Sequence, residues 1–373
     1  MILFLHHRYR SSGGEERAVA ELQWLVRERL GEDAELLERS SAGLSRSRAA
    51  TGLLRGGLEP HEVAAAVRRT RARVVHAHNV HPTLGWRALA AAREAGAAVV
   101  LHLHQYRTVC AIGVCFRDGH ECLSCHGRNT LPGVIHNCRD SRAQAAAYGA
   151  GLMMWQRRLA AQADAFVVPS RFAESRLRTL GAPLGPTFVV PHVIRRFSAP
   201  APRAPDGPAL LVSRLSPEKG VEVAIDACRI AGRELVIAGD GPERRRLEGS
   251  GIDGAAGPVR FVGHVSDDEL VRLRRRAAVA VVPSRSAETF GLAAAEAMAA
   301  GLPVAASRIG ALPELVPDDW LTEPGDARGL ARTIELLAAD GGAGERATEL
   351  VRAVSAPEVV APALAAVYDF AAT

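Results

Sequence analysis

Short apolar runs rich in β-branched residues alternate along the chain with longer stretches of helical periodicity. In the N-terminal half, the runs predicted to form strands cover residues 2–6, 74–78, 98–104 and 165–170. In the C-terminal half, they cover residues 209–214, 234–239, 259–263, 279–284 and 303–307. This alternation is typical of βαβ units that build parallel sheets.

A segment rich in proline and small residues, SAPAPRAPDGP at 198–208, separates the two halves and predicts a linker. The chain of 373 residues is long enough for two domains. We therefore expect an α/β fold of two doubly wound, Rossmann-like domains, at 1–192 and 193–355. A helix at 356–373 is expected to cross back to the first domain. Ligands of such sheets bind beyond the carboxyl ends of the strands, so facing domains would share one cleft.

Composition places the chain among globular proteins, with 48% hydrophobic and 23% charged residues. No stretch approaches the roughly 18 uncharged apolar residues of a membrane span. The first residues, MILFLHHRYR, turn polar too early for a secretory signal. We therefore expect a cytoplasmic protein.

Lys219 is the only lysine among 46 basic residues. It lies in SRLSPEKG (213–220), which follows a predicted strand and also carries Arg214. Arginine offers a planar fork and lysine a compact ammonium, so a site shaped around a point charge would reject the exchange. Two cations on one loop at a sheet edge suit a diphosphate. A solvated basic turn is the alternative.

The segment ETFGLAAAE (288–296) places two glutamates eight positions apart around the start of a predicted helix. Its first free amides, near Phe290, Gly291 and Leu292, would form an anion site. Glu288 beside that site would repel the anion unless it addresses another part of the ligand, such as hydroxyls. A ligand with phosphates and hydroxyls is a nucleotide sugar. Alternatively, Glu288 complements the helix dipole and Glu296 faces water.

Together these motifs resemble the retaining glycosyltransferases of the GT-B fold, family 4. In the second domain the resemblance rests on R-x4-K (214–219), AGDGPE (238–243), VRFVGHVSDDEL (259–270) and E-x7-E (288–296). In the first domain it rests on HHRYRSSGGEERAVAELQWLV (6–26) and VVLHLHQYRTVCAIGVCFRDGHECLSC (99–125). The resemblance extends over about residues 1 to 320 and implies a GT-B fold.

The resemblance assigns donor-binding roles in the second domain. Arg214 and Lys219 would hold the donor diphosphate, and Glu288 would bind hydroxyls of the donor sugar. Glu296 would bind the ribose, and backbone near Val265 would contact the base. Backbone at Phe290 and Gly291, together with Leu292 at the helix start, would complete the donor site.

Two residues of the first domain also match the family pattern. Gly14 would let the backbone approach the donor phosphate, and His104 would face the donor sugar. The implied catalytic set is therefore His104, Glu288, Arg214 and Lys219. Gln105 stands where the family has Asn or Asp, and His192 stands in place of the usual Asn after the hinge proline.

The family retains the anomeric configuration, and the departing diphosphate is thought to help deprotonate the acceptor. Positive groups around that diphosphate would stabilise the charge developing in the transition state. We expect no metal in catalysis, because no D-x-D lies in a suitable loop. SDDEL (266–270) is better explained as a helix start with a capping box. A UDP-sugar is the first expectation for the donor, and a hydroxyl of a natural product or surface glycan for the acceptor.

Five of the six cysteines cluster in an insertion at about 106–146. Four of them, Cys110, Cys122, Cys125 and Cys138, match a structural zinc site, with free thiols as the alternative. We expect Tyr9, Arg107 and this insertion to border the first-domain side of the cleft, where they are candidates for acceptor contacts. The histidine pairs at 76/78 and 102/104 share strand faces, which fits a metal site or, more commonly, core packing.

Two other functions stay open. The scaffold could serve a nucleotide-sugar hydrolase or epimerase, which would turn over donor without an acceptor. The cysteines and arginines could instead bind nucleic acid, but the arginines are scattered and we expect no nucleic-acid partner. Arginines between residues 46 and 73 could touch an anionic membrane as a peripheral contact, although a solvated face is commoner. The oligomeric state is left open.

Overall fold

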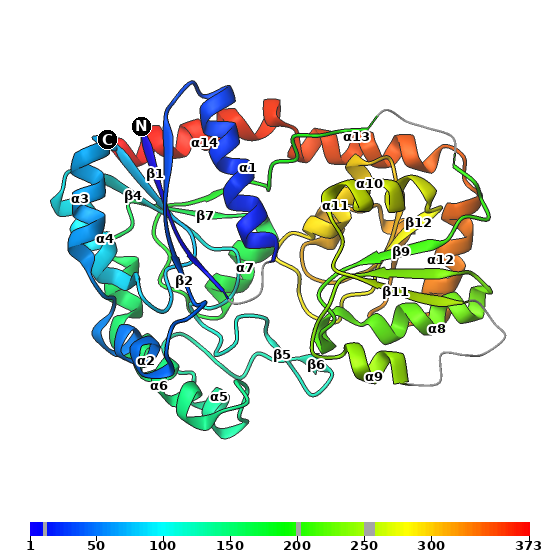
Figure 1. Cartoon of the computed structure of the whole chain (residues 1–373), viewed down its shortest axis with the longest axis horizontal. Coiled ribbons are helices and arrows are strands. Elements are labelled where there is room, and N and C mark those ends of the chain that lie inside the picture. Colours follow the sequence, from blue (N-terminus) through cyan, green and yellow to red (C-terminus); the bar gives the residue numbers. More distant parts are fainter. Residues whose placement is uncertain (10–12, 199–202, 250–257) are drawn as a thin grey trace. The chain divides into compact units, whose positions relative to one another are not determined.

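The computed structural model describes residues 1–9, 13–198, 203–249 and 258–373 (Figure 1). They form two compact units. The first comprises Met1–Arg117, Cys122–Val193 and Pro357–Thr373, and the second comprises Asp118–Glu121 and Ile194–Ala356. Part of the expected linker, residues 199–202, lies outside the described residues.

The first unit is built on a six-stranded parallel sheet with the order β2-β1-β3-β4-β7-β8. Its strands are β1 (Ile2–Arg8), β2 (Ala34–Ser40), β3 (Val74–Ala77), β4 (Ala98–His102), β7 (Ala165–Val168) and β8 (Thr187–Val189). Its connecting helices are α1 (Gly14–Arg29), α2 (Arg46–Arg55), α3 (Pro60–Thr70), α4 (Gly85–Glu94), α6 (Arg142–Ala160) and α7 (Arg171–Thr179). Strands β2 and β3 lie on opposite sides of β1, where Ile2 pairs with Ala34 of β2 and with Val74 of β3. The strand order therefore reverses at β1, and the switch point lies between β1 and β3.

The last helix, α14 (Pro357–Ala372), completes the core of the first unit. It runs beside α1 in Figure 1 and buries Val360, Leu364, Val367 and Tyr368. Residues 343–372 are long and apolar enough to cross a membrane by length and composition alone. The apolar face of α14 is accounted for by the core that it joins.

The cysteine-rich insertion holds little regular structure. It contains the two-residue strands β5 (Phe116–Arg117) and β6 (His120–Glu121), which pair with each other, and the short helix α5 (Leu131–Ile135). Most of its backbone is turn and bend.

The second unit holds another six-stranded parallel sheet, in the order β11-β10-β9-β12-β13-β14. Its strands are β9 (Ala209–Val212), β10 (Leu235–Ala238), β11 (Val259–Gly263), β12 (Val279–Val282), β13 (Val304–Ser307) and β14 (Leu321–Thr322). Its α-helices are α8 (Val221–Ala231), α9 (Arg244–Gly249), α10 (Asp267–Arg276), α11 (Leu292–Ala299), α12 (Ala327–Ala339) and α13 (Ala343–Ser355). Single turns of 3-10 helix occur at Pro217–Lys219, Leu312–Glu314 and Asp318–Trp320.

The strand order of the second sheet reverses between β9 and β12. Both strands are almost completely buried, because helices cover both faces of a parallel sheet. A crevice for ligands is expected outside the carboxyl ends of these two strands. The two doubly wound parallel sheets confirm the α/β fold class expected from the sequence.

Candidate active site

Two loops meet at the switch point of the second sheet. One follows β9 and contains residues 213–220, and the other follows β12 and contains residues 283–291. Gly220 has φ of 62°, and a Cβ there would lie 2.2 Å from the carbonyl oxygen of Pro283. The amide of Arg285 donates to the carbonyl of Glu218 at 2.8 Å. Glycine therefore lets the two loops pack backbone to backbone.

Lys219 and Glu288 form an ion pair across these loops. The Nζ of Lys219 donates to Oε1 of Glu288 at 2.7 Å, and the hydroxyl of Ser284 donates to the same oxygen at 2.6 Å. Burial opposes both charges, but each charge stabilises the other, so the pKa of Lys219 is raised and that of Glu288 is lowered. Both groups are therefore charged at neutral pH. Ser284 is a partner that the motif search did not single out.

Arg214 occupies the same loop as Lys219, and its side chain is exposed. Its charge is close enough to that of Lys219 to lower the pKa of the lysine slightly against the larger opposing effect of Glu288. Two neighbouring cations, of which one lies in the open, are suited to a ligand that carries more than one negative charge.

The helix predicted to start near Gly291 is present as α11, Leu292–Ala299. Gly291 caps it with φ of 94°, and a Cβ there would lie 2.6 Å from Cδ2 of Leu312. The amides of its first turn have no partner within the helix, which makes this end attractive to an anion. Phe290 is buried beneath it, and the carbonyl of Glu288 accepts from the amide of Ala311 at 2.9 Å.

Glu296 lies on the second turn of α11 and is 13% exposed. Its Oε2 accepts a hydrogen bond from Arg274 of α10 at 2.6 Å, and Arg274 is 11% exposed. The alternative in which Glu296 faces water is therefore wrong for this structure. Ser266 caps α10 by accepting from the amide of Glu269, as its capping-box spacing predicts. Val265 precedes it and packs against the core.

Four of the residues that the sequence predicts to bind donor or acceptor belong to the first unit. His104, just beyond β4, is buried, and its Nε2 lies 2.7 Å from Nδ1 of His78. Gly14 is the first residue of α1. The guanidinium of Arg107 lies 4.3 Å from the centre of the Tyr9 ring, so these two residues are neighbours, and their contact with an acceptor stays a prediction.

Glu15 is a further residue of this region that the sequence search missed. Together with His104 and Arg107 it lines a small cavity of the first unit, near the switch point between β1 and β3. Burial raises the pKa of Glu15 to about 7, although Arg107 acts in the opposite direction. A carboxyl group that titrates near neutral pH beside a cavity is a common feature of functional sites.

The cysteines of the insertion are reduced. Cys110 and Cys115 are buried, and a hydrogen bond between their side chains is the main cause that lowers the pKa of Cys110 to about 6. Cys122, Cys125 and Cys138 are half-buried. Among the described residues, the groups of three potential ligands that lie close together are histidines. The zinc site at the cysteines stays a prediction.

Matches to known families cover most of the chain. Residues 3–192 match the family described as Glycosyl transferase 4-like domain, and residues 208–340 match Glycosyl transferases group 1. A glycogen synthase of Mycobacterium tuberculosis is 39% identical over 169 residues, covering 42% of this chain and 40% of the relative. A GDP-mannose-dependent alpha-(1-6)-phosphatidylinositol dimannoside mannosyltransferase of the same species is 39% identical over 179 residues, covering 43% and 45%. The chain thus matches less than half of the length of these relatives.

Solved structures resemble the chain over its whole length. Sucrose-phosphate synthase from Thermosynechococcus elongatus superposes with a TM-score of 0.71 at 22% identity and covers 100% of this chain and 99% of its own. Anabaena Alr3699/HepE in complex with UDP has a TM-score of 0.63 at 18% identity, with 98% of both chains covered. These likenesses confirm the two-domain, Rossmann-like GT-B fold. Because the first of the two family matches spans half of its length, the chain belongs to the glycosyl transferase 4-like family.

Proposed function

We propose that this protein is a retaining glycosyltransferase that moves a sugar from a nucleoside-diphosphate donor to a hydroxyl acceptor. The observation that carries the proposal is the charged pair of Lys219 and Glu288 at the switch point of the second sheet, beside the start of α11. Cations and helix-end amides suit the diphosphate, and a carboxylate suits sugar hydroxyls. These are the two halves of a nucleotide sugar.

The proposed chemistry places the developing negative charge where the protein is positive. As the sugar departs, charge builds on the diphosphate, and Arg214, Lys219 and the first amides of α11 stabilise it. Glu288 holds the donor sugar through its hydroxyls, and its pairing with Lys219 keeps both groups oriented. The acceptor oxygen then attacks from the face that the diphosphate leaves, with its proton passing to the diphosphate. In this proposal fixed cations do what a metal ion does in other transferases.

The donor that we test first is a UDP-sugar. The structural relative from Anabaena was solved with UDP and also with UDP-glucose, which supports this choice. The mycobacterial mannosyltransferase is named for GDP-mannose, so GDP-sugars belong in the same screen. Relatives are also named for amylovoran and avilamycin A biosynthesis, which supports a surface glycan or natural product as acceptor.

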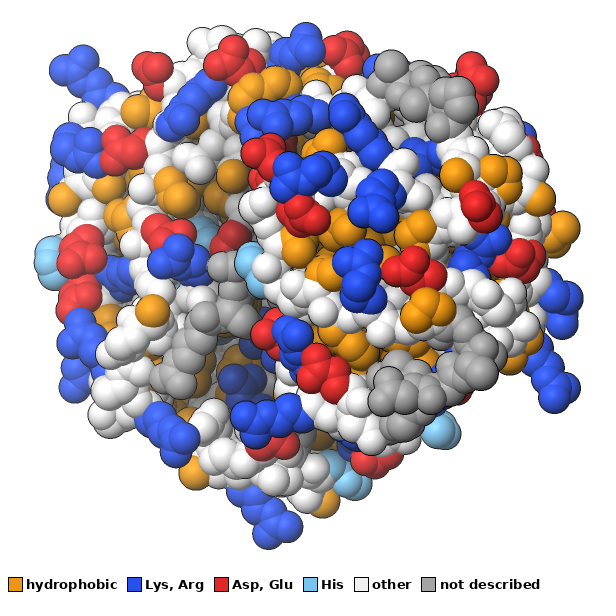
Figure 2. Space-filling model, turned by 45° about the vertical axis from the view of Figure 1, so that its right-hand side comes forward, with side chains coloured by type: hydrophobic (Ala, Val, Ile, Leu, Met, Phe, Trp, Pro, Cys, Tyr) orange, Lys and Arg blue, Asp and Glu red, His pale blue; other side chains and the backbone are white. Residues whose placement is uncertain are grey.

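An acidic polymer is a poorer partner for this surface. Figure 2 shows arginine side chains intermingled with acidic ones over the face turned to the viewer. Several exposed arginines among the described residues are held by neighbouring carboxylates; for example, Arg272 donates to Glu269 at 2.9 Å. Nucleic-acid binding needs basic side chains gathered along one face. We therefore propose a donor and an acceptor as the partners, and no nucleic acid.

The test begins with the melting temperature in the presence of UDP, GDP, ADP and the corresponding sugars. A ligand at 100 times its Kd stabilises the protein by roughly 2.7 kcal/mol, which such a melt resolves. The sugar nucleotide that binds is then incubated with the enzyme, with and without an extract of candidate acceptors. We expect release of nucleoside diphosphate that depends on the acceptor, and a product with the anomeric configuration of the donor by NMR. Equal release without acceptor identifies a hydrolase instead, and no melting shift with any nucleotide contradicts the proposal.

A further inference from the structure

Five buried histidines stack inside the first unit. They are His76, His78, His102, His104 and His192. Residues 76 and 78 lie on one face of β3 and its extension, and residues 102 and 104 do the same on the neighbouring strand β4. The rings of His102 and His104 are 4.0 Å apart between centroids, and those of His76 and His78 are 4.4 Å apart. Aliphatic side chains would fill this space at a lower cost in free energy, because buried imidazole nitrogens need hydrogen-bond partners.

Three of these rings have nitrogen atoms without a hydrogen-bond partner among the described residues. Nδ1 of His76 lies 2.8 Å from the hydroxyl of Tyr368, and its Nε2 has no partner. Nδ1 of His78 lies 2.7 Å from Nε2 of His104, and its own Nε2 has no partner. Neither nitrogen of His102 has one. Buried polar atoms left in this state typically cost about 1–3 kcal/mol each.

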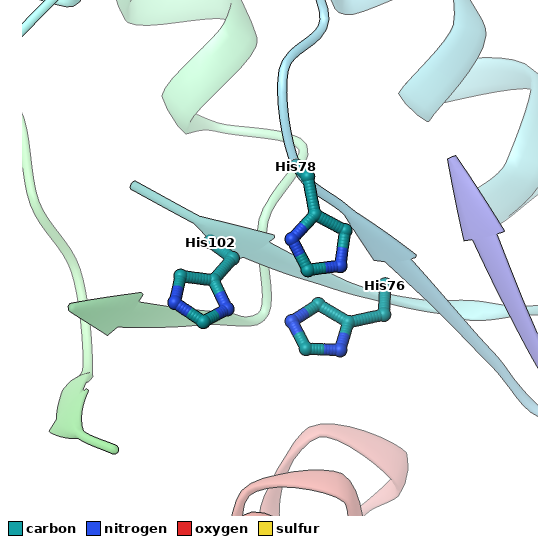
Figure 3. A group of neighbouring side chains, drawn as sticks. All are labelled: His76, His78 and His102. Carbon is teal, nitrogen blue, oxygen red and sulfur yellow. The ribbon is translucent and has the colours of Figure 1, made fainter. Parts of the chain in front are cut away.

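Ring nitrogens of three of these histidines lie close together. His76, His78 and His102 each offer a nitrogen that lies within 4.8 Å of those of the other two, and Figure 3 shows the three rings gathered between β3, β4 and α14. We propose that these three residues bind a divalent first-row transition metal, represented by zinc. Imidazole suits zinc, copper and nickel, and three protein ligands leave a fourth position for water.

The surroundings of the three rings support this assignment. A histidine that binds metal through Nε2 usually donates its Nδ1–H to a second partner, which fixes the ring. His76 has such a partner in Tyr368 of α14, and His78 has one in His104. Burial lowers the pKa of His76 to about 3, so its ring is neutral at pH 7, and a neutral imidazole is the form that binds a metal.

A second group, formed by His102, His104 and His192, shares one ring with the first. His104 and His192 take part in further interactions in this structure, whereas the nitrogens named above for His76, His78 and His102 have no hydrogen-bond partner among the described residues. We therefore place the ion at the first group. The three histidines belong to the first unit and the donor loops to the second, so the test of the metal site does not depend on the proposed transferase activity.

Zinc binding is measured on the full chain without a histidine tag, after removal of metal with a chelator. We expect one equivalent of Zn²⁺ per chain with nitrogen or oxygen neighbours at about 2.0 Å by X-ray absorption, in addition to any zinc that the cysteines of the insertion bind through sulfur at about 2.3 Å. Co²⁺ bound at the three histidines should itself give visible absorption without a thiolate charge-transfer band. Binding to the sulfurs alone, or no binding, overturns the proposal.

Variants assign the ligands. His102→Gln should abolish the equivalent of bound zinc, and Tyr368→Phe, which keeps the packing, should weaken binding by about 10-fold or more. His61→Gln, an exposed histidine of α3, is the matched control and should bind as the wild type does. Circular dichroism shows whether each variant folds. If His102→Gln does not fold, the X-ray absorption of the wild type still tests whether nitrogen ligands bind the ion. If His192→Gln removes the ion and His76→Gln does not, the assignment to the first group is wrong.

Discussion

At the scale of single residues, the only lysine of the chain lies in a site that uses its compact ammonium group. The ammonium of Lys219 donates to the carboxylate of Glu288 within a crowded pair of loops. A guanidinium is larger and planar, and it would not fit the same geometry. The sequence identified both residues, but their mutual contact became visible only in the fold because 69 positions separate them.

Glu15 leads to a prediction about pH. Its pKa is raised to about 7, chiefly by burial, with Glu16 acting in the same direction and Arg107 and His6 opposing. Between about pH 4.5 and 7 the unfolded chain releases this proton and the native state keeps it, so the native state binds more protons and stability falls as the pH rises. Because the side chain of Glu15 is only half-buried, water screens part of this effect, and we expect the free energy of unfolding to fall by about 1–2 kcal/mol over this pH range.

Glu15→Gln removes this titration while keeping the shape of the side chain. Measured by urea denaturation, the variant should gain stability relative to the wild type between pH 4.5 and 8, and the two should differ least at the acid end. Glu28→Gln, an exposed glutamate on the same helix α1, serves as the control and should follow the wild-type profile. A constant difference between Glu15→Gln and wild type across this pH range would show that the carboxyl titrates normally.

At the scale of elements, the sequence predicted best the strands that helices cover on both faces. β9 and β12 are short runs of aliphatic residues, and both lie where expected. β2 was missed because AELLERS lies at the edge of its sheet, where half of the strand meets solvent and polar residues interrupt the pattern. β14 has only two residues, which is too short for an alternation of apolar and polar positions to be recognised.

The site was predictable to the extent that it depends on local sequence. The loops after β9 and β12 and the start of α11 follow from strand ends and a glycine. The partners Arg274 and Tyr368 were not predictable, because they come from helices that packing alone brings to Glu296 and His76. Such contacts depend on how helices settle on a sheet, which no local pattern specifies.

The start of α11 gives a prediction at this scale. Gly291→Ala introduces a side chain at φ of 94° and against Leu312, so the first turn of the helix must shift. We expect a loss of about 1–3 kcal/mol in stability and weaker binding of the nucleoside diphosphate. Gly341→Ala, where a Cβ meets nothing within 4 Å, is the control. Calorimetry of melting and of ligand binding checks both effects, and an unaltered Gly291→Ala variant would contradict the role of this helix end.

At the scale of the whole molecule, the two sheets reverse their strand order at the same kind of point but with different chemistry beside it. The second sheet carries paired charges and a helix end beside its switch point, as expected for a phosphate-bearing ligand. The first carries Glu15 and a group of buried histidines. The family match and the fold agree with what the sequence predicted. The different functions proposed for the two sheets are what experiments must test.

The central claim is that Lys219 binds the diphosphate of the donor. The most direct test compares the Kd of the best nucleoside diphosphate with that of its nucleoside, in the wild type and in Lys219→Ala, with the exposed Arg272→Ala as control. A charge-assisted hydrogen bond contributes about 1.5–3 kcal/mol, so Lys219→Ala should raise the Kd of the nucleoside diphosphate by at least about 10-fold. The Kd of the nucleoside should stay within about two-fold of the wild-type value. Equal weakening of both ligands, or of neither, would contradict the account.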